Sequence, residues 1–244
     1  MQHARYGDPE GRSVTPQEFI ELAGPRYREA GTLPYCPSCR QPVFVYGVHS
    51  TAVASRFQHF ELPEDADPLD DCPLADRSGR LGGIVPDGWD EARGRQLRAA
   101  FFEPENIRNF YAFCLAMCRR GNLPTQKWAK MLERADRKGI WRYAGMPLWV
   151  VPYVLLTLEN FTATSKTDGE YAFHFVLDKP KGASASALWL SPEKCRLKKV
   201  FASNGEAVTA EDNPYPVSLE ALRAKAGDTA WISDALLARL VAPA

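Results

Sequence analysis

Three cysteines and one histidine in the first third of the chain have the spacing of metal ligands. The pattern is Cys36-x2-Cys39-x19-His59-x12-Cys72, where x is any residue. Zinc binds four nitrogen or sulfur ligands in a tetrahedron, and a Cys-x-x-Cys turn supplies two thiolates from one short segment. The segment has little apolar core of its own, so a bound ion would supply part of its folding energy. The sequence therefore predicts one zinc ion, bound by these residues.

The choice of histidine leaves one alternative open. His49 is the other histidine close in sequence, whereas His59 ends a predicted strand that returns towards the cysteine turn. A chance Cys-x-x-Cys with an unrelated cysteine and histidine nearby is the remaining interpretation. Three cysteines and one histidine fill all four zinc positions, so the predicted site is structural and not catalytic.

The elements that must position these ligands form a small β module. Pro42 to Val48 and Ala52 to Phe60 are expected to be two strands joined by a short turn. Before them, Thr15-Pro16-Gln17-Glu18 is a capping box that begins a helix. An acidic loop over residues 61–71 follows, and the glycines and serine of residues 78–83 are typical of a linker.

The remainder of the chain is predicted to be helical first and mixed afterwards. From Trp89 to Leu158 apolar residues recur every three or four positions, which indicates helices. Pro152 should kink or divide the last of them. Residues 171–177 alternate as a strand does, and Ala187–Leu190 and Cys195–Ala202 are expected to pair with it. Two short helices should close the chain.

These elements predict an α+β fold with a zinc-ribbon-like β module, a helical middle and a small α/β C-terminal part. The expected segments are an N-terminal helical segment (1–33), the zinc-ribbon-like module (34–83), a helical domain (84–165) and a small α/β domain (166–244).

Composition limits the classes of partner. The 30 Lys and Arg balance the 30 Asp and Glu, so the whole charge indicates neither nucleic acid nor membrane. The longest apolar stretch, Met146–Leu158, is shorter than the roughly 20 residues of a membrane helix. The first residues lack the apolar run of a secretion signal, so we expect a cytoplasmic protein.

In the reducing cytoplasm, cysteines more often bind metal or pack in a core than form disulfides. We interpret Cys114 and Cys118 as core thiols.

The distribution of charge indicates nucleic acid where the total does not. Residues 93–142 hold 12 Lys and Arg against 4 Asp and Glu. Such a basic stretch is typical of phosphate contacts. It is also compatible with the solvated face of ordinary helices, or with pairing to the acidic loop. The predicted nucleic-acid contacts are Arg119, Arg120, Lys127, Lys130, Arg134 and Lys138.

Residues 36–74 resemble the zinc-ribbon segment of bacterial competence CoiA-like proteins. The resemblance lies in Cys36-Pro37-Ser38-Cys39, Arg56-Phe57-Gln58-His59-Phe60 and Asp71-Cys72-Pro73-Leu74. Arg56 stands where the family often has a first histidine.

The same resemblance implies a restriction-endonuclease-like nuclease domain after the ribbon. Such a domain needs an acidic residue followed by Asp or Glu, any residue and Lys. Pro192-Glu193-Lys194 lacks the spacer, and Asp178-Lys179-Pro180-Lys181 lacks the acidic residue of that triplet. The resemblance therefore extends to the zinc module, and the sequence does not supply the nuclease motif.

Three hypotheses for function follow. The first is a non-catalytic, zinc-stabilised nucleic-acid-binding protein, or a subunit of a bacterial nucleoprotein complex in antiviral defence, CRISPR-like or mobile-element machinery, with other protein subunits as further partners. The second is a divalent-metal nuclease related to CoiA-like proteins. The third is a protein-interaction adaptor scaffolded by the zinc ribbon.

Overall fold

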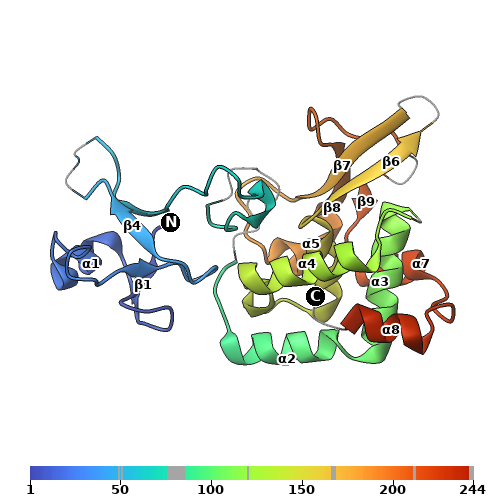
Figure 1. Ribbon diagram of the computed structural model, residues 1–244, viewed down its shortest axis with the longest axis horizontal. Helices are drawn as coiled ribbons and strands as arrows, with labels where there is room; N and C mark the ends of the chain where they lie inside the picture. Colours follow the sequence, from blue (N-terminus) through green and yellow to red (C-terminus); the bar gives the residue numbers. More distant parts are fainter. Residues whose placement is uncertain are drawn as a thin grey trace. The chain divides into compact units, whose positions relative to one another are not determined.

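The computed structural model of the chain describes residues 1–48, 50, 52–75, 86–119, 121–165, 169–210 and 213–241 (Figure 1). It divides into two compact units, unit 1 over Met1–Arg77 and unit 2 over Ser78–Ala244. Helices and strands mix in the order expected of an α+β fold, which confirms that prediction. The finer division into four segments stays a prediction. No described helix is long and apolar enough to cross a membrane.

Unit 1 is built from two small antiparallel sheets and one helix. One sheet has the strand order β2-β1-β3, and the other is the β4-β5 hairpin. The predicted strands beginning at Pro42 and Ala52 are present in shorter form, as β4 and β5. The elements are β1 (Ala4–Tyr6), β2 (Ser13–Val14), α1 (Pro16–Ala23), β3 (Pro34–Tyr35), β4 (Val43–Tyr46), β5 (Arg56–His59) and the 3-10 turn η1 (Pro68–Asp70).

The predicted capping box begins α1. The Thr15 hydroxyl accepts a hydrogen bond from the Glu18 amide at 3.3 Å, and the Glu18 carboxylate accepts one from the Thr15 amide at 2.7 Å. The Thr15 hydroxyl also donates to the Glu18 carboxylate at 2.9 Å, and the two bonds donated to this carboxylate lower the pKa of Glu18, the one from the backbone amide most. Val14 and Phe19 are both buried in the core of unit 1, where a hydrophobic staple places them.

Loss of this cap should destabilise unit 1 measurably. We expect Thr15→Ala to lower the free energy of unfolding by about 1 kcal/mol, because it leaves the Glu18 amide unsatisfied. Thr15→Ser keeps the hydroxyl and should stay close to wild type. Urea denaturation at fixed zinc concentration, followed by far-UV circular dichroism, measures both. Equal stability of the alanine variant and wild type would contradict the capping role.

Unit 2 packs helices against a four-stranded antiparallel sheet in the order β6-β7-β8-β9. Its core includes Phe113, Trp128, Tyr153 and Phe173, all fully buried. The helices are α2 (Glu91–Phe101), α3 (Pro104–Cys118), α4 (Thr125–Lys138), α5 (Val151–Leu156), α6 (Ala187–Leu190), α7 (Leu219–Ala226) and α8 (Asp234–Val241), and the 3-10 turns are η2 (Ile140–Arg142), η3 (Leu148–Val150) and η4 (Pro192–Lys194). The strands are β6 (Asn160–Ser165), β7 (Gly169–Asp178), β8 (Arg196–Phe201) and β9 (Tyr215–Pro216).

One sequence-based expectation for unit 2 is wrong, and the others are confirmed. Residues 187–190 were expected to be a strand and instead form the short helix α6, which follows a bend at Ser184 to Ser186. The apolar stretch Met146–Leu158 is divided as Pro152 predicted, into the 3-10 turn η3 and the short helix α5. The β-strand from Cys195 and the two closing helices are confirmed with small shifts of their ends.

Candidate metal centre

The turn between β3 and β4 presents Cys36 and Cys39 together. The Cys36 amide donates to the Gln41 carbonyl at 2.9 Å, and the Arg40 amide donates back to the Cys36 carbonyl at 3.0 Å. Arg40 closes the turn with a φ of 61°, in the left-handed region. This conformation folds the chain back sharply after Cys39, so both thiols point to the same side.

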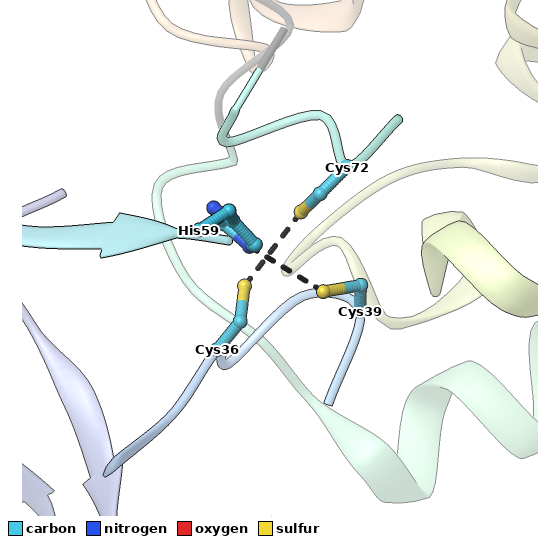
Figure 2. A group of neighbouring side chains, drawn as sticks. All are labelled: Cys36, Cys39, His59 and Cys72. Atoms are coloured by element: carbon cyan, nitrogen blue, oxygen red, sulfur yellow. Dashed lines mark hydrogen bonds between the residues drawn. The ribbon is translucent and has the colours of Figure 1, made fainter. Parts of the chain in front are cut away.

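The hairpin and the following loop supply the other two ligands. His59 ends β5 and pairs with Val43, the first residue of β4, so the hairpin register brings its ring back to the cysteine turn. Cys72 lies in the loop after η1, where the Ala75 amide donates to its carbonyl at 2.9 Å. Figure 2 shows the four side chains pointing to one centre.

The distances between the ligand atoms fit a tetrahedral zinc ion. Cys36 Sγ and Cys72 Sγ are 3.7 Å apart, and Cys39 Sγ and His59 Nε2 are 3.5 Å apart (Figure 2). Zn–S bonds of about 2.3 Å and Zn–N bonds of about 2.05 Å give tetrahedral edges of about 3.8 Å and about 3.6 Å. All four ligand atoms lie within 4.8 Å of one another, so small inward shifts of the longer pairs complete the tetrahedron.

The surroundings of the sulfur atoms suit thiolates. The Ser38 amide donates to Cys36 Sγ and the Leu74 amide donates to Cys72 Sγ, both at 3.4 Å. In the metal-free cluster, hydrogen bonds from the Cys36 and Cys72 thiols lower the pKa of Cys39 to about 3. Hydrogen bonds with Cys39 and Cys72, and burial, raise the pKa of Cys36. A divalent cation would therefore replace protons held between closely packed sulfurs.

Burial shields most of this cluster from solvent, although Cys39 is half-buried. Cys36 is fully buried, while Cys72 and His59 are 5% and 9% exposed. With three sulfurs and one nitrogen in place, the donor set fills the four positions of a zinc ion. The arrangement thus fits a structural site. We call Cys36, Cys39, His59 and Cys72 the Cys3His cluster.

The other candidate metal ligands are not part of this cluster. His49, the alternative histidine, lies outside the described residues. Cys114 and Cys118 are fully buried in unit 2, and burial raises the pKa of both thiols. The Cys114 thiol donates to the Pro152 carbonyl at 3.7 Å, which agrees with their interpretation as core residues. Within the described chain, the Cys3His cluster is the one group of three or more His, Cys, Asp or Glu side chains placed to hold a metal.

The six residues predicted to contact nucleic acid differ in their exposure to solvent. Arg134 and Lys138 are buried, at 6% and 4% exposed, which argues against a place for them on a phosphate-binding surface. Lys127 is half-buried, and its ammonium donates to the Asn160 carbonyl at 2.7 Å. Arg119 and Lys130 are exposed, and Arg120 lies outside the described residues.

Acidic partners within unit 2 explain part of its basic excess. Arg98 makes two hydrogen bonds to Asp136, each 2.8 Å long. Three further arginines of the basic stretch also have carboxylate partners in the same unit, in the pairs Arg108–Asp234, Arg134–Glu159 and Arg142–Glu91. These cations therefore hold the fold together, and the exposed surplus is smaller than the sequence indicates.

Asp178, in the stretch that partly matches a nuclease motif, has a structural partner. Asp178 ends β7, and its carboxylate pairs with Lys198 on β8 at 2.6 Å. Among the described residues, Asp178 belongs to no group of three or more His, Cys, Asp or Glu side chains that could hold a metal.

Comparison of the chain with models of known protein families, with curated proteins and with solved structures found no match.

Proposed function

We propose that the chain is a non-catalytic nucleic-acid-binding protein whose N-terminal unit folds around one structural zinc ion. The observation that carries the zinc assignment is the Cys3His cluster, in which the Cys36–Cys72 and Cys39–His59 atom pairs have the edge lengths of a zinc tetrahedron. Thiolate ligands favour zinc over magnesium or calcium, which prefer oxygen. Such thiolates persist in a reducing compartment, in keeping with a cytoplasmic protein.

Charge supports nucleic acid as the partner of unit 2. Unit 1 carries 7 Lys and Arg against 12 Asp and Glu, whereas unit 2 carries 23 against 18. Arg119 and Lys130 are exposed, and among the described residues neither has an ion pair. Among the described members of the predicted set, these two are the exposed ones.

The resemblance of residues 36–74 to CoiA-like proteins supports the same proposal. It covers the ligands of the Cys3His cluster and implies a bacterial nucleic-acid context. We propose a subunit of a bacterial nucleoprotein complex, in defence, CRISPR-like or mobile-element machinery. We do not propose the nuclease activity that the resemblance implies, because the described residues hold no cluster of three or more potential metal ligands that includes a carboxylate.

Salt dependence of binding tests this proposal. Zinc-replete protein should bind labelled DNA or RNA with an affinity that falls linearly with salt on logarithmic axes. We expect the pair Arg119→Glu and Lys130→Glu to reduce that slope by about 1.4 on a single strand, because each lost phosphate contact removes about 0.7. Arg223→Glu, an exposed change on α7, is the matched control.

Two results would count against the proposal. An unchanged slope in the paired variant would remove Arg119 and Lys130 from the interface. Absence of binding by the wild-type protein at low salt would overturn nucleic-acid binding altogether and would favour a protein-interaction adaptor.

A further inference from the structure

The β4-β5 hairpin has one buried face and one exposed face. Val43 and Phe57 are buried, and His59 points with them towards the metal site. Side chains alternate along a strand, so Phe44 and Tyr46 lie on the opposite face of β4. There Tyr46 pairs with Arg56 and Phe44 pairs with Gln58.

Aromatic rings and guanidinium groups lie against one another on this exposed face. The Phe44 and Phe60 rings are 5.2 Å apart, and the Arg28 guanidinium carbon lies 5.2 Å and 5.9 Å from their centres. The Arg56 guanidinium carbon lies 4.9 Å from the centre of the Tyr46 ring. Tyr46 and Phe60 are 43% and 47% exposed, so their ring surfaces are open to a ligand. We call Arg28, Phe44, Tyr46, Arg56 and Phe60 the aromatic–arginine face.

The two arginines of this face have no acidic partner among the described residues. The hairpin strands themselves carry no Asp or Glu. The acidic excess of unit 1 lies mostly in the loop after β5, where residues 61–71 hold 6 Asp and Glu. The aromatic–arginine face therefore carries two cations and no carboxylate of its own.

A groove lies beside Arg28. It has a volume of about 630 Å³ and is lined by the turn after α1 and the far end of β4. Arg26 and Arg28 line it together with one acid, Glu29. Its volume falls in the range of sites that take small molecules of nucleotide size, roughly 300–1,000 Å³.

We propose that the aromatic–arginine face binds single-stranded nucleic acid. Unpaired bases stack on the exposed rings, and the two guanidinium groups stack on bases or contact the phosphates. Phe44 and Tyr46 are two residues apart on one strand face, roughly 6.8 Å, which leaves room for a separate base on each ring. This inference rests on the proposed function and adds a second surface, on unit 1, with a preference for unpaired strands.

The chemistry of the face favours a single strand over other occupants. A duplex keeps its base faces stacked inside the helix, where protein rings do not reach them without unstacking. A hydrophobic protein segment would leave two desolvated guanidinium groups without anionic partners, which is costly. A single strand offers both flat apolar rings and negative charge.

Fluorescence anisotropy with labelled 15-residue oligo(dT), oligo(U) and a duplex tests the inference on the full, zinc-replete chain. The double variant Tyr46→Ala and Phe60→Ala should bind the better of the two single strands at least about tenfold more weakly, because each lost ring–base stack weakens binding by roughly 5- to 150-fold. Leu22→Ala, an equally exposed apolar change on α1, is the matched control. Unchanged zinc content shows that a variant is folded.

The arginines have their own control. Arg28→Gln with Arg56→Gln should lower the salt slope on a single strand by up to about 1.4, for two phosphate contacts. Arg12→Gln should leave it unchanged, although Arg12 also lies over a ring, 5.9 Å from the centre of Tyr6. Photocrosslinking with a 5-iodouracil strand should label the peptide that contains β4 or β5.

The outcomes separate this inference from the proposed function. Wild-type binding that survives the double ring variant, with crosslinks confined to unit 2, would overturn the inference and leave the proposed function intact. Wild-type protein that binds neither strand would overturn both and would assign the face to a protein partner. Tight binding of either DNA or RNA, lost in the ring variant, supports the inference.

Discussion

Removal of the metal is expected to unfold unit 1 while unit 2 stays folded. The core of unit 1 contains only a few buried apolar side chains, and Cys36 and Cys72 are two of them. Without the ion, three thiols and an imidazole remain packed together with no cation to bind. Structural zinc contributes about 10–16 kcal/mol in small zinc-finger peptides, more than such a core supplies. Unit 2 has a large core of its own and no metal group among its described residues.

The distribution of tryptophan separates the two units in one experiment. All 6 Trp residues belong to unit 2, so their fluorescence reports on unit 2 alone. We expect a strong zinc chelator to abolish amide-exchange protection in β1 to β5 and to leave the tryptophan emission unchanged. Cys36→Ser should do the same without chelator, whereas Cys118→Ala should keep one zinc per chain. Persistent protection of β4 and β5 in metal-free protein would contradict a structural role for the ion.

Loss of the Arg134 charge should have the largest effect on unit 2. The Arg134 guanidinium donates to Glu159 Oε2 at 2.8 Å and to the Leu158 carbonyl at 3.0 Å. The two side chains are only 7% and 11% exposed. Arg134→Met would leave the Glu159 carboxylate buried and unpaired, which costs about 3–5 kcal/mol. For a unit of this size, that corresponds to a fall in Tm of roughly 6–20 °C.

Two comparisons define this effect. Lys130→Met, an exposed change on the same helix, should stay within about 0.5 kcal/mol of wild type. Arg134→Met combined with Glu159→Leu should recover part of the loss, because an apolar pair of similar volume replaces two buried charges. Calorimetry measures all three variants. An Arg134→Met protein with wild-type Tm and weaker nucleic-acid binding would restore Arg134 to the phosphate surface.

The ligands of the metal site could be predicted because their information is local. The Cys36–Cys39 turn and the strand ending at His59 can each be predicted from a few neighbouring residues. Their spacing indicated that the cysteine and histidine side chains lie close together. The capping box at Thr15 is equally local, since its two hydrogen bonds join residues three apart. Only the hairpin register, which pairs Val43 with His59, was needed from the structure to bring the ligands together.

The burial of Arg134 was not predicted, although part of its signal was present. Arg134 and Lys138 lie three and seven positions after Met131, on the buried stripe of α4. Helical spacing therefore placed both on the inner face, but a charged residue there is stable only with a partner. That partner, Glu159, is 25 residues away, in the bend between α5 and β6. Sequence patterns do not reveal such a pairing.

The aromatic–arginine face depends on tertiary structure in a similar way. The alternation in β4 predicts that Phe44 and Tyr46 share a face, but not whether that face is exposed. Arg28 comes from the turn after α1 and reaches the rings only because Tyr27 is buried beside the hairpin, where its hydroxyl accepts from the Val45 amide at 3.1 Å. The contact between Arg28 and Phe60 spans 32 positions of sequence.

X-ray absorption spectroscopy at the zinc edge, on protein purified without added metal, tests the central claim most directly. We predict one zinc per chain, with three sulfur atoms at about 2.3 Å and one nitrogen atom at about 2.0–2.1 Å. The His59→Ala variant should lose the nitrogen scatterer or the metal, because His59 Nε2 lies 3.5 Å from Cys39 Sγ in the cluster. A wild-type protein without zinc, or with a shell of oxygen and nitrogen alone, would contradict the Cys3His assignment.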